Sequence, residues 1–134
     1  MLLQPKKSKY NKLRKGRLAR AEFRPVKLQF GIFGLKSLES GSISAKQIEA
    51  ARQAITRKMN RNGHVWIRVF PDLPITKKPV EVRMGKGKGS FKHWSAKIRG
   101  GSILFEIDGV SEKLAFAALR TGGAKLPVKT VAVS

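Results

Sequence analysis

The 134-residue chain contains no cysteine, which excludes disulfide bridges, zinc sites with thiolate ligands and cysteine nucleophiles. It has no apolar run approaching the roughly 20 residues of a transmembrane helix, and its N-terminus lacks the apolar core of a signal peptide. A mitochondrial presequence is disfavoured, because Pro5, Gly16 and closely spaced Lys and Arg residues interrupt any apolar helix face. Hydrophobic residues still make up 41% of the chain, enough for the core of one modest domain.

Residues that could perform catalysis are also few. Glu106 and Asp108 are the only acids spaced to share a strand face. Asp108 is followed by Gly109, and this Asp-Gly sequence favours a turn at the strand end over a pair of catalytic acids. His64 and His93 fall on separate expected strands without further metal ligands nearby. The glycine-rich segment 85–89 has neither the spacing of a phosphate-binding Walker loop nor that of a dinucleotide fingerprint. We therefore expect no catalytic residues, no metal and no cofactor.

Positive charge dominates what is present. The chain has 29 Lys and Arg against 8 Asp and Glu, a formal charge of +21. Such a chain binds polyanions, and phosphate backbones are the commonest kind. An anionic membrane is the weaker alternative, because no long amphipathic helix with bulky apolar residues is present. We therefore expect a nucleic acid as the partner and no membrane.

The hydrophobic pattern predicts an α+β fold, a mainly antiparallel sheet with two helices packed on one side. One helix follows the capping box Ser44–Gln47 and stops at Asn62-Gly63; the other begins after Ser111 and is expected to end early at Thr121-Gly122-Gly123. Gly34 and residues 40–41 are expected to break the chain, and residues 71–74 to turn it. The expected strands are 26–33, a central strand 64–70, the pair 80–84 and 94–98, 102–107, and a closing strand 127–133.

Two segments outside this pattern favour contact with RNA. The first 27 residues carry ten basic residues and one acid, Glu22, and have too little apolar content to fold alone. We interpret residues 1–25 as a basic arm that threads along RNA, and residues 26–134 as a single domain. The second segment, a Gly-Lys loop at 83–89, combines glycines that permit close backbone approach with cations for phosphate.

Many ordered stretches resemble the family of the bacterial-type large-subunit ribosomal protein numbered sixteen. The resemblance covers nearly the whole chain and rests on MLLQPKK at 1–7, RKGR at 14–17, FGLK at 33–36, QIEAAR at 47–52, VWIRVFPD at 65–72, VRMGKGKG at 82–89 and AKLP at 124–127. It implies a protein that binds large-subunit ribosomal RNA (rRNA) near the site of incoming tRNA. It also implies that the Gly-Lys loop faces the peptidyl transferase centre, where RNA itself performs catalysis.

The expected sites follow from these interpretations. The rRNA-binding residues are expected to be Lys6, Lys7, Lys9, Lys12, Arg14, Lys15, Arg17, Arg20, Arg52, Arg57, Lys58, Arg61 and Arg68. The loop facing tRNA and the peptidyl transferase centre is expected to comprise Arg83, Met84, Gly85, Lys86, Gly87, Lys88 and Gly89.

The expected partners are large-subunit rRNA, tRNA in the A site with the P site as a further candidate, and neighbouring ribosomal proteins, without homo-oligomers. Departures from the family pattern, such as His93 in place of a tyrosine and Leu73 after Pro71-Asp72, favour a mitochondrial ribosome over a bacterial cytoplasm or a plastid. Because the family's own start coincides with Met1, we expect an organelle-encoded or bacterial gene. Two alternatives stay open: a free RNA chaperone or DNA-compacting protein, and a small hydrolase acting on a polyanion.

Overall fold

The computed structural model describes residues 3–18, 20–22 and 26–134. Among these residues, two helices and seven strands follow in the order β1 (Phe33–Ser37), β2 (Gly41–Ser44), α1 (Ala45–Lys58), β3 (His64–Ile67), β4 (Leu73–Lys77), β5 (Ser90–Ile98), β6 (Ile103–Asp108), α2 (Glu112–Gly123) and β7 (Thr130–Val133). The strand pairings are antiparallel, so the predicted α+β class is confirmed.

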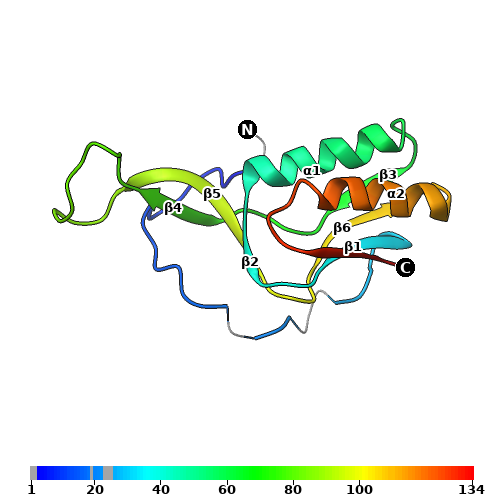
Figure 1. Cartoon of the computed structure of the whole chain (residues 1–134), viewed down its shortest axis with the longest axis horizontal. Coiled ribbons are helices and arrows are strands. Elements are labelled where there is room, and N and C mark those ends of the chain that lie inside the picture. The colour runs from blue at the N-terminus through cyan, green and yellow to red at the C-terminus, as the bar shows by residue number, and fades with distance from the viewer. Residues whose placement is uncertain (1–2, 19, 23–25) are drawn as a thin grey trace.

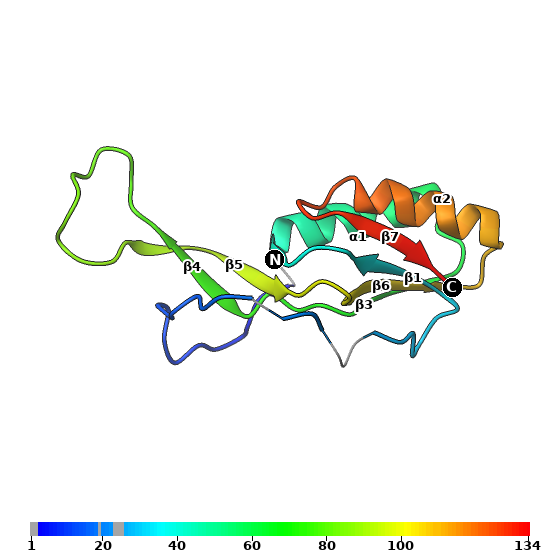
Figure 2. The same ribbon diagram turned by 60° about the horizontal axis from the view of Figure 1, so that its bottom comes forward.

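The strands form two sheets. A four-stranded sheet has the order β3-β6-β1-β7, and both helices lie on one face of it (Figure 2). A three-stranded sheet has the order β2-β5-β4, and its β4–β5 hairpin projects away from the helices with the connecting loop at its tip (Figure 1). The described part of the N-terminal segment passes along the side opposite the helices.

The core lies between the helices and the four-stranded sheet. On α1, the predicted apolar face is buried, with Ile48, Ala51 and Ile55 at 0% exposure. Ser44 forms the predicted capping box with Gln47, whose side chain accepts from the Ser44 backbone N–H at 2.9 Å. Left-handed backbone at Asn60, Arg61 and Gly63 follows the last turn, so the helix stop falls close to the predicted position.

The second helix does not end early, as the sequence had predicted. α2 continues through Thr121, Gly122 and Gly123. Glycine suits the last two positions because neighbouring elements lie too close there for a side chain. A Cβ on Gly122 would lie 2.5 Å from Cγ1 of Ile55 in α1, and one on Gly123 would meet the Thr130 hydroxyl in β7. Close packing therefore offsets the roughly 1 kcal/mol that each glycine costs inside a helix.

Several strand predictions were wrong. Residues 26–32 form no strand, because backbone N–H groups of this segment donate to a side chain instead of to a neighbouring strand. Gly34, where a break was expected, lies within β1. The expected central strand at 64–70 is shortened to β3 at the sheet edge, and the buried central strand is β6. Residues 80–84 lie in an exposed loop; β4, which begins inside the expected turn at 71–74, pairs with β5 instead. The predicted strands at 94–98, 102–107 and the end of the chain are confirmed, with bounds that differ from the expected ones by at most four residues, the largest difference being the start of β5 at Ser90.

Candidate nucleic-acid interface

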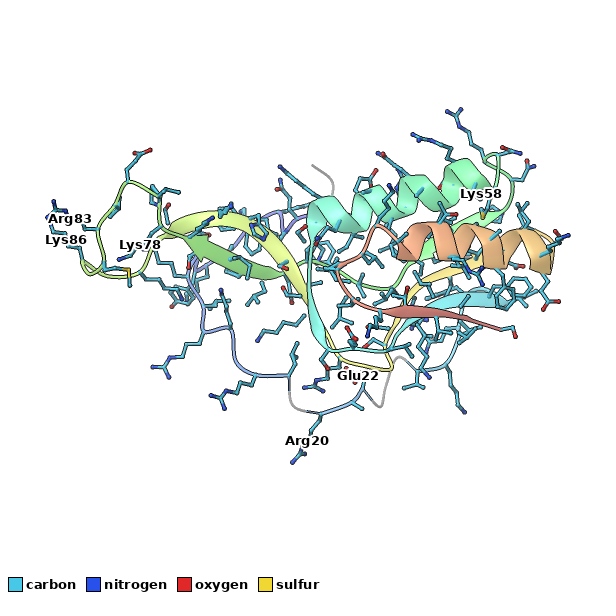
Figure 3. The ribbon with its side chains drawn as sticks, viewed as in Figure 1. Arg20, Glu22, Lys58, Lys78, Arg83 and Lys86 are labelled. Carbon is cyan, nitrogen blue, oxygen red and sulfur yellow. The ribbon has the colours of Figure 1, made fainter. Side chains whose placement is uncertain are left out.

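The basic N-terminal segment lies in extended contact with the body of the protein. Residues 3–18 contain no helix or strand, and their predicted RNA-binding Lys and Arg side chains are exposed. Leu3 packs against the core, and the backbone N–H of Glu22 donates to the carbonyl of Gly100 at 2.9 Å. The Arg20 side chain points away from the body (Figure 3). This segment therefore presents a line of cations while its backbone is held at intervals.

The Gly-Lys loop lies at the far tip of the β4–β5 hairpin. Gly85, Lys86 and Gly87 have consecutive positive φ angles of 97°, 52° and 83°, the left-handed region that glycine adopts at little cost. No atom lies within 4 Å of where a Cβ would stand at Gly85 or Gly87, so the glycines are required by backbone conformation. Figure 3 shows Arg83 and Lys86 at the end of the loop, directed into open space.

The arm and the loop contact each other. The Lys12 ammonium donates to the carbonyl of Lys88 at 3.3 Å, and the Lys88 ammonium donates to the carbonyl of Leu13 at 2.7 Å. At the base of the loop, Lys78 donates to the carbonyl of Gly85. Two segments that were predicted separately to bind RNA therefore form one continuous basic surface.

The basic residues of α1 form a second surface. Arg52, Arg57 and Arg61 line a hollow of about 510 Å³ at the end of α1, with Asn60 beside them. Arg52 is partly neutralised, because it donates to Glu49 at 2.6 Å and this hydrogen bond lowers the pKa of Glu49.

Lys58 is exposed at the same end of α1 (Figure 3). Figure 3 places Lys58 at the opposite end of the molecule from Arg83 and Lys86. The structure therefore does not bring the α1 cations and the loop together.

Arg68 has internal partners. Its guanidinium contacts the carboxylate of Glu106, which is 0% exposed, and donates to the side-chain oxygen of Gln29 at 3.0 Å. Backbone N–H groups of Gln29, Phe30 and Gly31 donate to the same carboxylate, with the Phe30 bond at 2.6 Å. Burial opposes ionisation of Glu106, but these hydrogen bonds outweigh it and lower the pKa of the carboxyl group. Glu106 is therefore a structural anion and is inaccessible as a general acid or base.

The structure adds cations that the sequence interpretation missed. Lys97 of β5, which was not among the expected residues, lines a hollow together with the predicted Lys15 and with His93. Burial, followed by the charges of Lys92, Lys46 and Lys15, lowers the pKa of His93. The sequence pattern of this strand indicates its apolar face but does not show which lysines of β5 lie beside the arm. Glu106 carried a usable signal, since an acid within the apolar run SILFEI requires a buried partner.

Other chemistry has little support in the described part of the chain. No group of three or more His, Cys, Asp or Glu side chains is positioned to hold a metal ion among residues 3–18, 20–22 and 26–134. Over the same residues, neither helix has the length and apolar character needed to cross a bilayer. The Asp108 carboxylate accepts from the backbone N–H of Gly109 at 2.7 Å, consistent with the predicted turn.

Comparison with known proteins identifies the family. The profile described as ribosomal protein L16p/L10e matches residues 5–133. The chain belongs to the ribosomal protein L16p/L10e family. Proteins named large ribosomal subunit protein uL16 from Chelativorans sp. (strain BNC1) and Bartonella bacilliformis are each 59% identical to it over 129 residues, and the one from Methylorubrum extorquens (strain PA1) is 60% identical. Each alignment covers 96% of this chain and 94% of the relative.

Membership of the L16p/L10e family confirms the predicted resemblance and the prediction that the chain is not an enzyme, because the family consists of ribosomal proteins. It also supports an rRNA partner and a place in the ribosome. These relatives are bacterial, and they do not distinguish a bacterial cytoplasm from a mitochondrion.

Proposed function

We propose that the protein is a structural constituent of the large ribosomal subunit and acts by binding and screening the charge of rRNA. The observation that carries the proposal is the family match over residues 5–133, in a chain whose formal charge is +21. Cations that neutralise phosphates release condensed counterions, which supplies affinity without any base-specific contact.

Within this proposal the two ends of the molecule bind different parts of the RNA. Residues 1–25 act as the RNA-threading arm, and residues 26–134 form a single domain. The cations of the arm contact phosphates, and so do those of the Gly-Lys loop, which contacts the arm through Lys12 and Lys88. The arginine-lined hollow at the end of α1 contacts a second RNA segment. Arg68 contributes indirectly, because its guanidinium is 12% exposed and holds the segment around Phe30.

The Gly-Lys loop is the proposed contact with tRNA in the A site, and with the P site if the tip reaches further. Its support is geometric: the loop projects from the body, carries Arg83 and Lys86 at its end, and has two glycines without neighbouring atoms (Figure 3). Such a tip can bring its backbone and cations close to RNA without contacting its own protein. The loop would position tRNA and screen charge while RNA performs peptide transfer.

Co-sedimentation tests the proposal. A lysate is separated on sucrose gradients at moderate and high salt, and each fraction is blotted for this protein. One copy per large subunit, retained at moderate salt, is expected, with neighbouring ribosomal proteins in the same fractions and no homo-oligomer. A spread through light fractions would favour the free RNA chaperone instead.

The compartment forms the finer part of the proposal. We retain the mitochondrial ribosome as the proposed location and the bacterial cytoplasm as its alternative, since the departures at Leu73 and His93 motivate the first and the bacterial relatives agree with the second. Isolation of ribosomes from purified organelles, if the host has them, decides between the two. Absence from organelle ribosomes and presence in cytoplasmic ones would reject the mitochondrial location.

A further inference from the structure

A row of aromatic side chains lies on the face of the four-stranded sheet that the helices leave uncovered. His64 and Trp66, two positions apart on β3, lie on the same side of the strand, with ring centroids 5.9 Å apart. The ring of Phe30, from the segment that crosses this face, stacks on Trp66 with centroids 6.3 Å apart and an angle of 23° between the ring planes. We call Phe30, Trp66 and His64 the aromatic row.

The ring of Phe30 is exposed although its backbone is fixed. Phe30 is 57% exposed, whereas its backbone N–H group donates to the buried carboxylate of Glu106. Gly31 lies so close to β6 that an added Cβ would stand 2.6 Å from the carbonyl oxygen of Ile107. The segment is therefore held by backbone contacts, and the folded core does not require the aromatic ring at position 30.

The surroundings of the row determine which kind of ligand suits it. The guanidinium carbon of Arg68 lies 5.1 Å from the centre of the Phe30 ring, so a cation borders the exposed aromatic faces. Two acids pair with β3 on this face: Glu106, opposite Trp66, is buried and paired with that same arginine, and Asp108, opposite His64, accepts from the backbone N–H of Gly109. The charge of Arg68 is already paired, so it orients the Phe30 ring and is not available to a phosphate. Flat, partly exposed π faces on a molecule of charge +21 match a nucleobase better than an apolar protein segment.

We propose that the aromatic row stacks an unpaired base of RNA. The inference deepens the proposed function, because it rests on RNA being the partner, and it adds a site outside the arm, the α1 surface and the Gly-Lys loop. Since every base has a π face, this contact tolerates any base. It selects single-stranded over paired RNA, because only unpaired bases are free to stack on a protein side chain. The prior fixation of Phe30 limits the ordering cost of binding.

Tryptophan fluorescence tests the proposal on the full chain. A Trp94→Phe background leaves Trp66 as the only tryptophan, because the chain has two. Single-stranded oligoadenylate, titrated at high salt to weaken phosphate contacts, is expected to quench Trp66, and the same strand paired with oligouridylate is expected to quench it far less. Phe30→Leu is expected to weaken binding of the single strand about five- to a hundredfold, as loss of one stacked base implies.

Phe91→Leu supplies the matched control. Phe91 is also exposed, at 40%, but contacts Trp94 on the other sheet, so its replacement is expected to leave the affinity measured at Trp66 unchanged. Circular dichroism checks that both leucine variants stay folded. Equal quenching by single-stranded and duplex RNA would overturn the proposal, as would equal losses of affinity in the two variants.

A second measurement separates this proposal from the proposed function. A benzophenone amino acid at position 30 is activated by light within purified large subunits, and an adduct with RNA is expected. An adduct with a neighbouring protein alone, or the protein bound in the subunit without any RNA adduct, would overturn the stacking site and leave the proposed function standing. Failure of the unsubstituted protein to enter large subunits would instead reject the proposed function.

Discussion

Glu106 is the residue whose charge most constrains the fold, because its carboxylate is fully buried and Arg68 is its cationic partner. Replacing Arg68 by Met would leave that charge without a counter-ion, and removing one partner of a buried pair costs about 3–5 kcal/mol. We expect the free energy of unfolding of Arg68→Met, measured by urea denaturation, to fall by about 3 kcal/mol.

Arg52→Met is the matched control for Arg68→Met. It breaks the Glu49–Arg52 pair, in which both side chains are more than a third exposed. Exposed pairs contribute about 1 kcal/mol or less, so the loss of stability should be small. Similar losses in the two variants would contradict the structural role assigned to Arg68.

The same carboxylate gives stability a pH dependence. Hydrogen bonds lower the folded-state pKa of Glu106 below its ordinary value of 4.5, so its contribution is complete above pH 4.5 and is lost as pH falls through the lower folded-state pKa. We expect the free energy of unfolding of Glu106→Gln to decline less steeply than that of the unsubstituted protein between pH 4.5 and pH 3. Parallel pH curves for the two proteins would show that Glu106 is not preferentially ionised in the folded state.

Residue-scale prediction from the sequence succeeded where a local rule applied. Ser44 and Gln47 form the expected capping box because its geometry involves only neighbouring residues. Arg68 was grouped with RNA-binding cations because its partner Glu106 is 38 positions away in sequence. The sequence alone gives no register between β3 and β6, so this ion pair could not be derived.

At the scale of elements, the two glycines near the end of α2 have opposite local and tertiary effects. Gly122→Ala should favour the isolated helix, but its Cβ would lie 2.5 Å and 2.8 Å from side-chain carbons of Ile55. Overpacking typically costs about 1–3 kcal/mol, which exceeds the roughly 1 kcal/mol gain in helix propensity. We expect Gly122→Ala to lower the thermal unfolding midpoint.

Thr121→Ala, in the same turn, is the control for Gly122→Ala. Thr121 is exposed, and its hydroxyl donates to the Ala117 carbonyl within the helix, so its replacement changes propensity without creating a clash. Its midpoint should stay equal or rise slightly. A raised midpoint for Gly122→Ala would mean that Ile55 moves aside at little cost and that close packing does not explain the glycine.

The Gly-Lys loop gives a second prediction at this scale. Gly87 has a φ of 83°, which a β-branched residue rarely adopts, and open space around its Cβ position. Gly87→Val should therefore change the loop tip while leaving the folded body and the N-terminal arm intact. We expect normal amounts of the variant in large subunits together with a slower rate of translation. A normal translation rate would reject the proposed contact with tRNA.

Element prediction failed where a side chain or another element replaced the expected strand partner. The alternating residues 26–32 suggested a strand, yet the N–H groups of Gln29, Phe30 and Gly31 bind Glu106. Val80, Val82 and Met84 also alternate with polar residues, but Val80 and Met84 are 93% and 96% exposed at the hairpin tip. Alternation indicates a strand only if a neighbouring strand is available, and the sequence does not specify neighbours.

At the scale of the whole molecule, charge was the most reliable guide. A formal charge of +21 predicted a polyanionic partner, and the ordered family motifs predicted the same partner independently. The distribution of that charge required the structure, because contact between Lys12 and Lys88 joins segments separated by 76 positions. The resulting arrangement, with the Gly-Lys loop and the exposed end of α1 at opposite ends (Figure 3), predicts that the loop and the α1 surface bind separate RNA segments.

Salt-dependent release from the subunit tests whether the arm is the main RNA contact. Each phosphate contact contributes about 0.7–0.9 to the slope of log affinity against log salt. Lys6, Lys7 and Lys9 changed together to Gln should therefore lower the slope by about 2 and release the protein at lower salt; deletion of residues 1–20 should lower the release salt further. The control changes Lys113, Arg120 and Lys125 to Gln, which removes equal charge from exposed positions in and just after α2. Since these α2 cations lie outside the proposed contacts, equal slopes for the two triple variants would show that net charge, and not the arm, determines attachment.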